Sequence, residues 1–281
     1  MPASPALTPD TPPTLRELLA FYLESGVDCA LAEEPVDLLG DTAPQPMPDP
    51  RPAAEPRPTL SRDPPPPRPV VAAAPAPEVV IAAAREAAAS APTLEALRAM
   101  LERFEGCALK STATQLVFAD GNPQAKVMIV GEAPGRDEDL EGLPFVGRSG
   151  KLLDLMLAAI GLDRTSVYIA NVIPWRPPGN RTPTPQETQI CLPFIRRQIQ
   201  LVDPDVLVTL GNPSTQALHA IADGIMRTRG RWRDYDTGTR IIKALPTFHP
   251  AFLLRQPANK RLVWQDLRAI AKVLAESKPS P

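Results

Sequence analysis

From residue 126 onward the sequence alternates short apolar runs with longer segments of helical periodicity, and this alternation constrains the fold more than any other feature. The apolar runs predict strands over residues 126–131, 166–173, 205–211 and 239–249. Helical periodicity predicts helices over residues 149–162, 184–202, 213–222 and 261–277. Because strands that alternate with helices pair in parallel, we expect an α/β fold. It would be a three-layer sandwich with a mostly parallel four-stranded sheet between helices.

The part of the chain before this alternation has a different composition. Of the 37 prolines in 281 residues, 14 lie within residues 41–77, and such a Pro/Ala-rich segment builds neither helix nor sheet. We expect a short helical segment over residues 1–40, a disordered linker over 41–77 and a folded domain over 78–281. The domain opens with an Ala-rich helical stretch over 78–105, broken at Pro92, after which Thr93 caps the next helix.

Charge divides near the same boundary. Residues 1–92 hold 13 acidic and 6 basic side chains, a net of -7, and residues 93–281 hold 19 acidic and 24 basic ones, a net of +5, so the two parts sum to -2. Two interpretations stay open. The acidic tail arises by chance and aids solubility, or a mildly basic domain binds a polyanion such as a nucleic acid.

Several protein classes are excluded by simple features. No apolar run approaches the roughly 18 residues of a membrane span, and the N-terminus lacks the basic and apolar regions of a secretory signal. Three widely spaced cysteines favour a reducing cytosol over a disulfide framework. We therefore expect a cytoplasmic protein that makes no contact with a membrane.

Four loops leave the carboxyl ends of the predicted strands, where α/β sheets bind their ligands, and three residues in them attract notice. Phe145 could be a core aromatic or a flat wall for a planar ligand. Asn171 could be a turn former or a donor–acceptor pair for the edge of a base. His249 follows a strand directly, whereas His219, the second histidine, lies on a predicted helix and suits a structural role. A phosphate-binding Walker loop does not fit, because Leu152 stands where that motif needs Ser or Thr.

Four loop motifs resemble those of the family 4 uracil-DNA glycosylases. They are GEAPGRDEDLEGLPFVGRSGKLL, YIANVIPWRPPGNRTPTPQE, LVTLGNPSTQAL and HPAFLLR, in the family's order and spacing. The resemblance covers about residues 104–277 and implies a uracil-DNA glycosylase-like fold. It also implies base excision repair of DNA: the enzyme flips uracil out of DNA and hydrolyses its N-glycosidic bond, leaving an abasic site.

The resemblance also implies roles for single residues. Phe145 would stack on the flipped uracil, Asn171 would read its O4/N3 edge, and His249 would donate to O2 of the leaving base. Gly131 and Ala133 would lie against the uracil. The remaining DNA contacts would come from Leu253, a wedge that fills the vacated base stack, and from Arg148, Arg181 and Arg255, which would hold the DNA backbone.

Two acidic residues are candidates for the hydrolytic water. Glu132 is the first candidate for positioning the water and steadying the cationic sugar, and Glu138 is the second. In better-known relatives an Asp does this at the position that Ala133 occupies here, so the assignment stays open between the two glutamates.

The resemblance further implies a [4Fe-4S] cluster held by four cysteines, but this chain departs from that pattern. The four positions are Cys107, Lys110, Trp175 and Cys191, and a lysine cannot replace a thiolate ligand. We therefore predict no cluster, with Trp175 filling the space.

Two other functions remain as alternatives. One is a non-catalytic DNA-binding and recruitment module derived from the same fold, and the other is a nucleotide hydrolase. In either glycosylase or module, we expect a monomer that meets uracil-containing DNA near the nucleoid, with a possible protein partner for the N-terminal arm.

Overall fold

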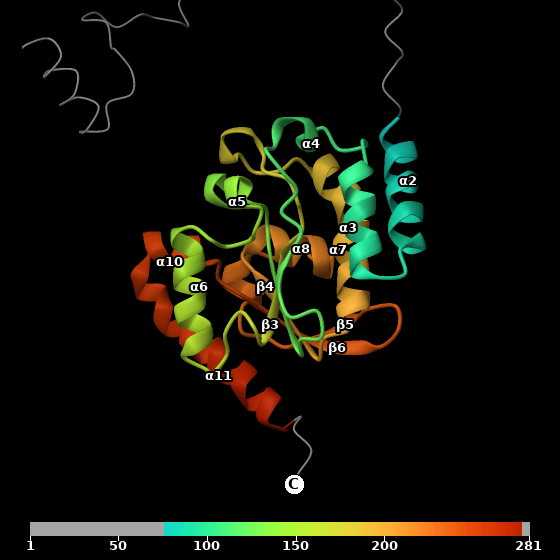
Figure 1. The fold of residues 1–281 in the computed structure, drawn as a ribbon. Helices are drawn as coiled ribbons and strands as arrows, with labels where there is room; N and C mark the ends of the chain where they lie inside the picture. Colours follow the sequence, from blue (N-terminus) through green and yellow to red (C-terminus); the bar gives the residue numbers. More distant parts are fainter. Residues whose placement is uncertain (1–75, 277–281) are drawn as a thin grey trace, which may run out of the picture. The chain divides into compact units, whose positions relative to one another are not determined.

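The computed structural model describes residues 76–276, and Figure 1 shows their fold. The predicted segment over 1–40 and nearly all of the predicted linker lie outside these residues. Helix α2 (Pro77–Ser90) begins at the last residue assigned to the linker. Within residues 76–276, no helix has the length and apolar character needed to cross a membrane.

A six-stranded sheet forms the centre of the fold, with the strand order β1-β3-β2-β4-β6-β5. The four inner strands run parallel to one another: β3 (Val167–Asn171), β2 (Val127–Gly131), β4 (Val206–Leu210) and β6 (Ile241–Thr247). These are the four strands predicted from the apolar runs, so the α/β class and the parallel core of the sheet are confirmed.

The predicted strand number was too low, because two short antiparallel strands close the edges of the sheet. Strand β1 (Asp120–Gly121) pairs with β3, and β5 (Arg233–Asp236) pairs with β6. Neither carries an apolar run: β1 has two residues, and β5 buries only Tyr235 among charged neighbours. An edge strand with one wet side needs little apolar character, so hydropathy alone did not reveal them.

Helices cover both faces of the sheet (Figure 1). On one face lie α2, α3 (Leu94–Arg103), α7 (Pro185–Val202) and α8 (Asn212–His219), and on the other lie α6 (Arg148–Ala158), α10 (Pro250–Arg255) and α11 (Lys260–Glu276). The short helices are α4 (Leu109–Thr112), α5 (Arg136–Glu141), α9 (Ile225–Thr228), η1 (Pro178–Asn180) and η2 (Pro257–Asn259).

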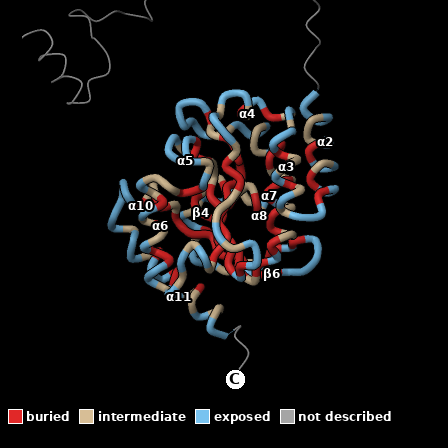
Figure 2. The backbone as a smooth tube through the Cα atoms, viewed as in Figure 1, coloured by how far each residue is buried: buried red, intermediate tan, exposed pale blue. Residues whose placement is uncertain are grey.

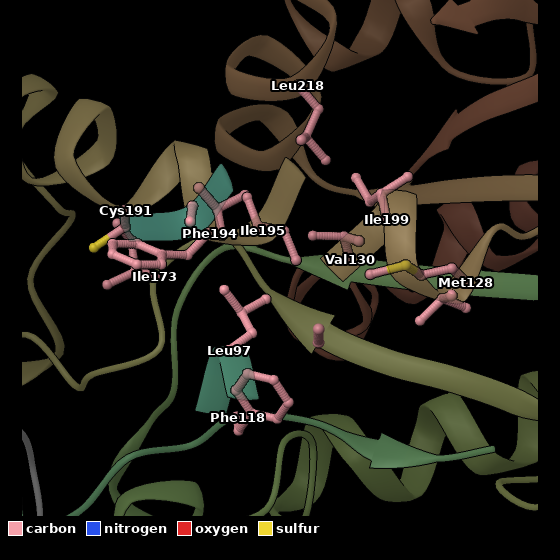
Figure 3. Close-up of a cluster of buried hydrophobic side chains, with 14 of the residues drawn as sticks. Leu97, Phe118, Met128, Val130, Ile173, Cys191, Phe194, Ile195, Ile199 and Leu218 are labelled. Atoms are coloured by element: carbon pink, nitrogen blue, oxygen red, sulfur yellow. The ribbon is translucent and has the colours of Figure 1, made fainter. Parts of the chain in front are cut away.

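The buried residues follow the sheet and the inner faces of these helices (Figure 2). Strand β2 shows the reason, because successive side chains of a strand point to opposite faces. Met128 and Val130 pack in the cluster with Leu97 and Phe118, which Figure 3 shows. Val127 and Ile129 point to the opposite face of the sheet. They pack in the second cluster, with side chains of α6 and α11. The strands β2, β3 and β4 are thus buried on both sides, as their apolar runs predict.

Two predicted helix starts are confirmed at atomic detail. The hydroxyl of Thr93 accepts the backbone N–H of Ala96 at 3.2 Å and caps α3, after the predicted break at Pro92. Helix α7 has Pro185 in its first turn, and Thr184 and Glu187 form a reciprocal capping box. These contacts fix the N-terminal end of α7, which follows the loop after β3.

Candidate active site

A cavity of about 610 Å³ opens where the parallel strands end, and the four predicted loops meet in it. The predicted site residues that line it are Glu132, Ala133, Glu138, Phe145, Asn171, Arg181, His249 and Arg255. Gly131 lies directly behind this lining, whereas Arg148 and Leu253 are not part of it. The topology therefore brings together residues that are more than 100 positions apart in the sequence.

Phe145 forms a buried aromatic wall of the cavity. The residue is 4 % exposed, and its ring lies against the imidazole of His249 with 5.4 Å between ring centroids and 28° between ring planes. Its backbone has a φ of 56°, a left-handed conformation that bulky side chains rarely adopt. A Cβ added at Gly131 would overlap both the Phe145 ring and the Asn171 amide oxygen, so this close approach requires glycine at position 131.

Asn171 offers an unused hydrogen-bond acceptor at the end of β3. The residue is 5 % exposed, and its amide oxygen Oδ1 is buried without a hydrogen-bond partner among the described residues. A buried acceptor without a partner costs free energy, roughly 1–3 kcal/mol. A ligand with an N–H group at this point would recover that cost.

His249 is held as a neutral imidazole with a defined proton position. His249 is the N-cap residue of α10, and its Nδ1 accepts the backbone N–H of Ala251 at 3.1 Å. Burial, with a smaller contribution from the positive charge of Arg255, lowers the pKa of His249 to about 4. At neutral pH the ring therefore carries its single proton on Nε2, and Nε2–H is a hydrogen-bond donor.

The two candidate glutamates have different surroundings. Glu138 is buried, and its carboxylate accepts backbone N–H groups from Gly135 at 3.0 Å and from Val146 and Gly147 at 3.1 Å each. Its oxygens are thus used to hold the loop that carries Phe145. Glu132 is partly buried, has no side-chain partner within residues 76–276, and has its pKa raised by burial. The available carboxylate in the cavity is that of Glu132.

The three arginines predicted to contact DNA are exposed, but they differ in their contacts and in their position relative to the cavity. Arg181 forms a bidentate pair with Glu187, at 2.6 Å and 2.9 Å, and this pairing is the main reason that the pKa of Glu187 falls to about 2. Arg255 lines the cavity. Arg148 lies in the first turn of α6, outside the cavity lining.

The structure does not support a wedge role for Leu253. Its side chain is 1 % exposed and packs in the core cluster on the α6 and α11 side of the sheet. A wedge must reach into the DNA from the surface, and this side chain points inward because α10 packs against α6 with that face. The neighbouring Leu254 is 37 % exposed, and Phe252 lines the cavity.

Other cavity residues were not singled out in the sequence. Asn212 begins α8 directly after β4, and its side-chain oxygen accepts the backbone N–H of Ile225 at 3.0 Å. Its position immediately beyond a strand was the available signal. Phe248 immediately precedes His249, and Phe252 lies in α10, which follows it; both line the cavity and give that side an aromatic lining.

The chain is similar to known uracil-DNA glycosylases. The sequence model of the Uracil DNA glycosylase superfamily matches residues 118–268. The type-4 uracil-DNA glycosylase of Archaeoglobus fulgidus is 40 % identical over 178 residues, which cover 62 % of this chain and 89 % of that protein. The type-4 enzyme of Thermotoga maritima is 41 % identical over 180 residues, with coverage of 62 % and 91 %.

A third relative gives the same result. The type-4 uracil-DNA glycosylase of Sulfurisphaera tokodaii is 37 % identical over 191 residues, which cover 66 % of this chain and 87 % of that protein. This chain belongs to the type-4 uracil-DNA glycosylase family.

The resemblance implies an iron–sulfur cluster for a type-4 uracil-DNA glycosylase, and the residues at the corresponding positions here do not fit one. Cys107 and Cys191 are buried with 3.9 Å between their sulfur atoms. Lys110 donates to Glu105 and to the carbonyl of Glu102, and Trp175 is 2 % exposed in the core. Residues 76–276 contain no group of three or more His, Cys, Asp or Glu side chains suited to a metal ion. Two thiols, an ammonium group and an indole cannot supply four ligands to a cluster.

Proposed function

We propose that this chain is a DNA repair glycosylase that flips uracil out of DNA and hydrolyses its N-glycosidic bond, leaving an abasic site. One observation carries the proposal: Phe145, the unpartnered oxygen of Asn171 and the neutral imidazole of His249 line one cavity at the ends of parallel strands. Family membership supports it independently.

Uracil recognition would depend on Phe145 and Asn171. The planar ring stacks on the Phe145 side chain, which supplies apolar contact for any base. Asn171 Oδ1 accepts the N3–H of uracil, and this bond satisfies the buried oxygen. Cytosine has an unprotonated N3, which would face this oxygen as a second acceptor. The amide therefore favours uracil over cytosine.

Cleavage would depend on His249 and Glu132. As the bond between the sugar C1′ and uracil N1 breaks, its electron pair moves onto the base and negative charge grows at O2. The Nε2–H of His249 donates to that oxygen, and a donor already in place stabilises the transition state more than the substrate. The carboxylate of Glu132 orients the water that bonds to C1′, and the proton lost by the water ends on the departed uracil.

We propose that the chain works without an iron–sulfur cluster, because two of the four ligand positions hold Lys110 and Trp175. The purified protein should contain less than one iron atom per ten chains and show no visible absorption band of a cluster. Stoichiometric iron after anaerobic purification would refute this.

We further infer that the protein is a monomer in the cytoplasm, close to the nucleoid, where its DNA substrate lies. The N-terminal arm, residues 1–92, is the candidate contact for a protein partner, since it lies before the family match, which begins at residue 118. Sedimentation of the full chain with and without DNA tests the monomer, and a dimer in both samples would contradict it.

Release of uracil from a labelled strand tests the function. The wild-type chain should leave abasic sites at uracil and intact cytosine, whereas Asn171→Ala and His249→Ala should lose most activity while remaining folded. Binding of uracil-containing and ordinary DNA with equal affinity, and no product, would instead identify a non-catalytic DNA-binding module.

A further inference from the structure

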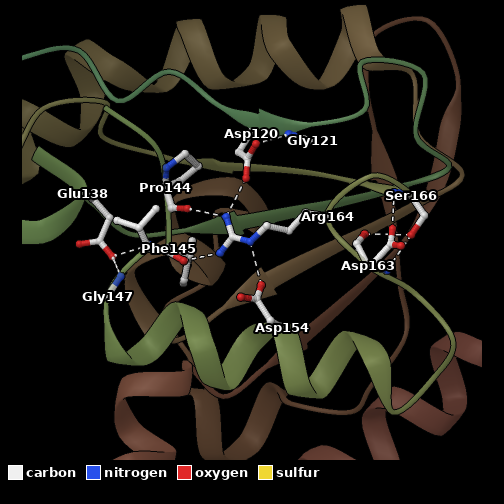
Figure 4. A network of polar contacts seen from close by, with 11 residues as sticks. Asp120, Gly121, Glu138, Pro144, Phe145, Gly147, Asp154, Asp163, Arg164 and Ser166 are labelled. Carbon is white, nitrogen blue, oxygen red and sulfur yellow. Dashed lines mark hydrogen bonds and ion pairs between the residues drawn. The ribbon is translucent and has the colours of Figure 1, made fainter. Parts of the chain in front are cut away.

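Arg164 contacts the backbone of the Phe145 loop (Figure 4) and is not part of the cavity lining. We propose that Arg164 is a positioning residue for base recognition, which holds Phe145 in the conformation that presents its ring to the flipped base. The proposal builds on the stacking role proposed above for Phe145.

The guanidinium group of Arg164 joins three separate parts of the chain. Nη1 donates to the carbonyl of Pro144 at 3.1 Å, and Nη2 donates to the carbonyl of Phe145. Its charge is balanced by Asp154 at 2.8 Å from Nε and by Asp120 at 2.7 Å from Nη1. A planar fork with five donors can make such a set of bonds, and a lysine cannot.

The conformation that these bonds hold is an unusual one. Phe145 has a φ of 56°, and a bulky residue stays in the left-handed region only where its surroundings fix it there. Arg164 binds the carbonyls of Pro144 and Phe145, which belong to the two peptide groups that flank Phe145. Glu138 accepts the N–H groups of Val146 and Gly147, and the Val146 N–H belongs to the same peptide group as the Phe145 carbonyl. The peptide groups before and after Phe145 are therefore both held.

Helix α6 completes this arrangement by approaching the loop closely. A Cβ added at Gly150 would overlap the carbonyl of Phe145, so the helix backbone lies directly against the peptide group that Arg164 binds. The Phe145 ring then has little freedom to turn away from His249. Without Arg164, two buried carbonyls lose their donor, and relaxation of φ toward negative values would carry the ring out of the cavity.

A purely structural role for Arg164 is the competing explanation, and the chain contains a suitable control. Arg240 also pairs with two carboxylates, those of Asp203 and Asp205, and also donates to two carbonyls, those of Asp203 and Pro204. It does not line the cavity. Arg164→Gln and Arg240→Gln thus remove comparable sets of bonds, one beside Phe145 and one remote from it.

The test is a double-mutant cycle measured by single-turnover release of uracil, using the full chain. Arg164→Gln should slow the cleavage step by roughly 10- to 100-fold, the range expected when a positioned group shifts by about 1 Å. Its affinity for uracil-free DNA should stay at the wild-type value. Arg240→Gln should cleave at the wild-type rate.

Combination with Phe145→Ala separates the proposal from the function on which it depends. If Arg164 acts through Phe145, Arg164→Gln should cost little or nothing further in the Phe145→Ala background. If Phe145→Ala itself cleaves normally, the stacking role of Phe145 fails. If Phe145→Ala is impaired and Arg164→Gln costs the same factor in both backgrounds, the positioning role of Arg164 fails.

Two further measurements test the proposal if Arg164→Gln folds poorly. Asp154→Asn removes one ion pair of Arg164 but no donor to the Phe145 loop, so it should fold and show a smaller defect of the same kind. Guanidinium ion at millimolar concentration should partly restore cleavage by Arg164→Ala, and should have no such effect on Arg240→Ala. Absence of any rescue, together with wild-type cleavage by Asp154→Asn, would overturn the proposal.

Discussion

The ring of Phe145 lies in direct contact with the imidazole of His249, with ring centroids 5.4 Å apart. The two rings leave no space for a base between them, so the flipped base must meet Phe145 and His249 at another surface or edge. The contact also means that each ring limits the movement of the other. The stacking role proposed for Phe145 and the leaving-group role proposed for His249 would therefore be coupled through this contact.

Phe145→Ala should reduce uracil release by roughly 5- to 150-fold, which corresponds to the 1–3 kcal/mol that aromatic stacking contributes per base. Part of the loss should come from His249, which loses its neighbour. The rate is measured with a single-stranded substrate, and affinity for uracil-free DNA is the control. A variant that cleaves at the wild-type rate would contradict the stacking role.

Glu132→Gln and Glu138→Gln should produce different defects. Glu132 has the available carboxylate, so its amide variant should lose roughly 100-fold or more in cleavage rate with little change in stability. Glu138 holds three backbone N–H groups, so its variant should lose roughly 1–3 kcal/mol of unfolding free energy. Urea unfolding and single-turnover kinetics on both variants distinguish the roles. The reverse pattern would assign the water to Glu138.

The two histidines should make the protein less stable in mild acid. Burial is the main cause that lowers the pKa of both His219 and His249 to about 4 in the folded chain, against about 6.5 in the unfolded chain. Between these values the unfolded chain binds more protons than the folded chain, so the unfolding free energy falls as pH falls through this window. Above about pH 6.5 the effect is absent.

His219→Gln tests how much His219 alone contributes to this pH dependence of stability. His219 lies outside the cavity, and its ring packs edge-on against Tyr235. Urea unfolding at several pH values between about 7 and 4 should show a shallower loss of stability in this variant than in the wild-type chain. Equal slopes would show that His219 titrates normally.

Trp175→Ala should destabilise the fold by about 3–5 kcal/mol, the usual cost of deleting a large buried aromatic side chain. The indole is 2 % exposed and packs in the core cluster that also contains Cys107 and Cys191. Urea unfolding measures the loss, and Trp264→Ala is the control because Trp264 is 44 % exposed. Equal stability of the two variants would mean that Trp175 does not fill essential space.

Leu253→Ala and Leu254→Ala should separate packing from surface contact. Leu253→Ala, at a buried position, should lower the unfolding free energy by about 2–5 kcal/mol. Leu254→Ala, at a more exposed position, should lower it by about 0.5 kcal/mol or less. At a temperature where both variants are folded, Leu253→Ala should cleave duplex DNA at the wild-type rate. A cleavage defect specific to duplex DNA in Leu253→Ala would restore the wedge role.

The sequence was most informative where burial and chain direction decide the structure. The inner strands β2, β3 and β4 are buried and almost entirely apolar, so their positions followed from the pattern. So did the place of Asn171 at the end of β3 and of Phe145 and His249 after the ends of β2 and β6. The edge strand β5 has charged residues on its wet side and gave no signal. The inward orientation of Leu253 depends on how α10 packs against α6, which a motif position does not specify.

Arg164 shows most clearly what could not be predicted from the sequence. Its partners lie 10, 19, 20 and 44 positions away in the sequence, and they come together only when the loop, α6 and the sheet edge have assembled. A surface arginine and a networked arginine look the same in a single sequence, because the difference lies in the distant groups that surround them.

The buried indole of Trp175 bears on how such a repair enzyme is made in the cell. If the chain works without a cluster, as proposed above, it would reach its native state directly after translation, without inorganic sulfide or the machinery that assembles and inserts clusters. Its uracil removal would then continue during iron starvation or oxidative stress.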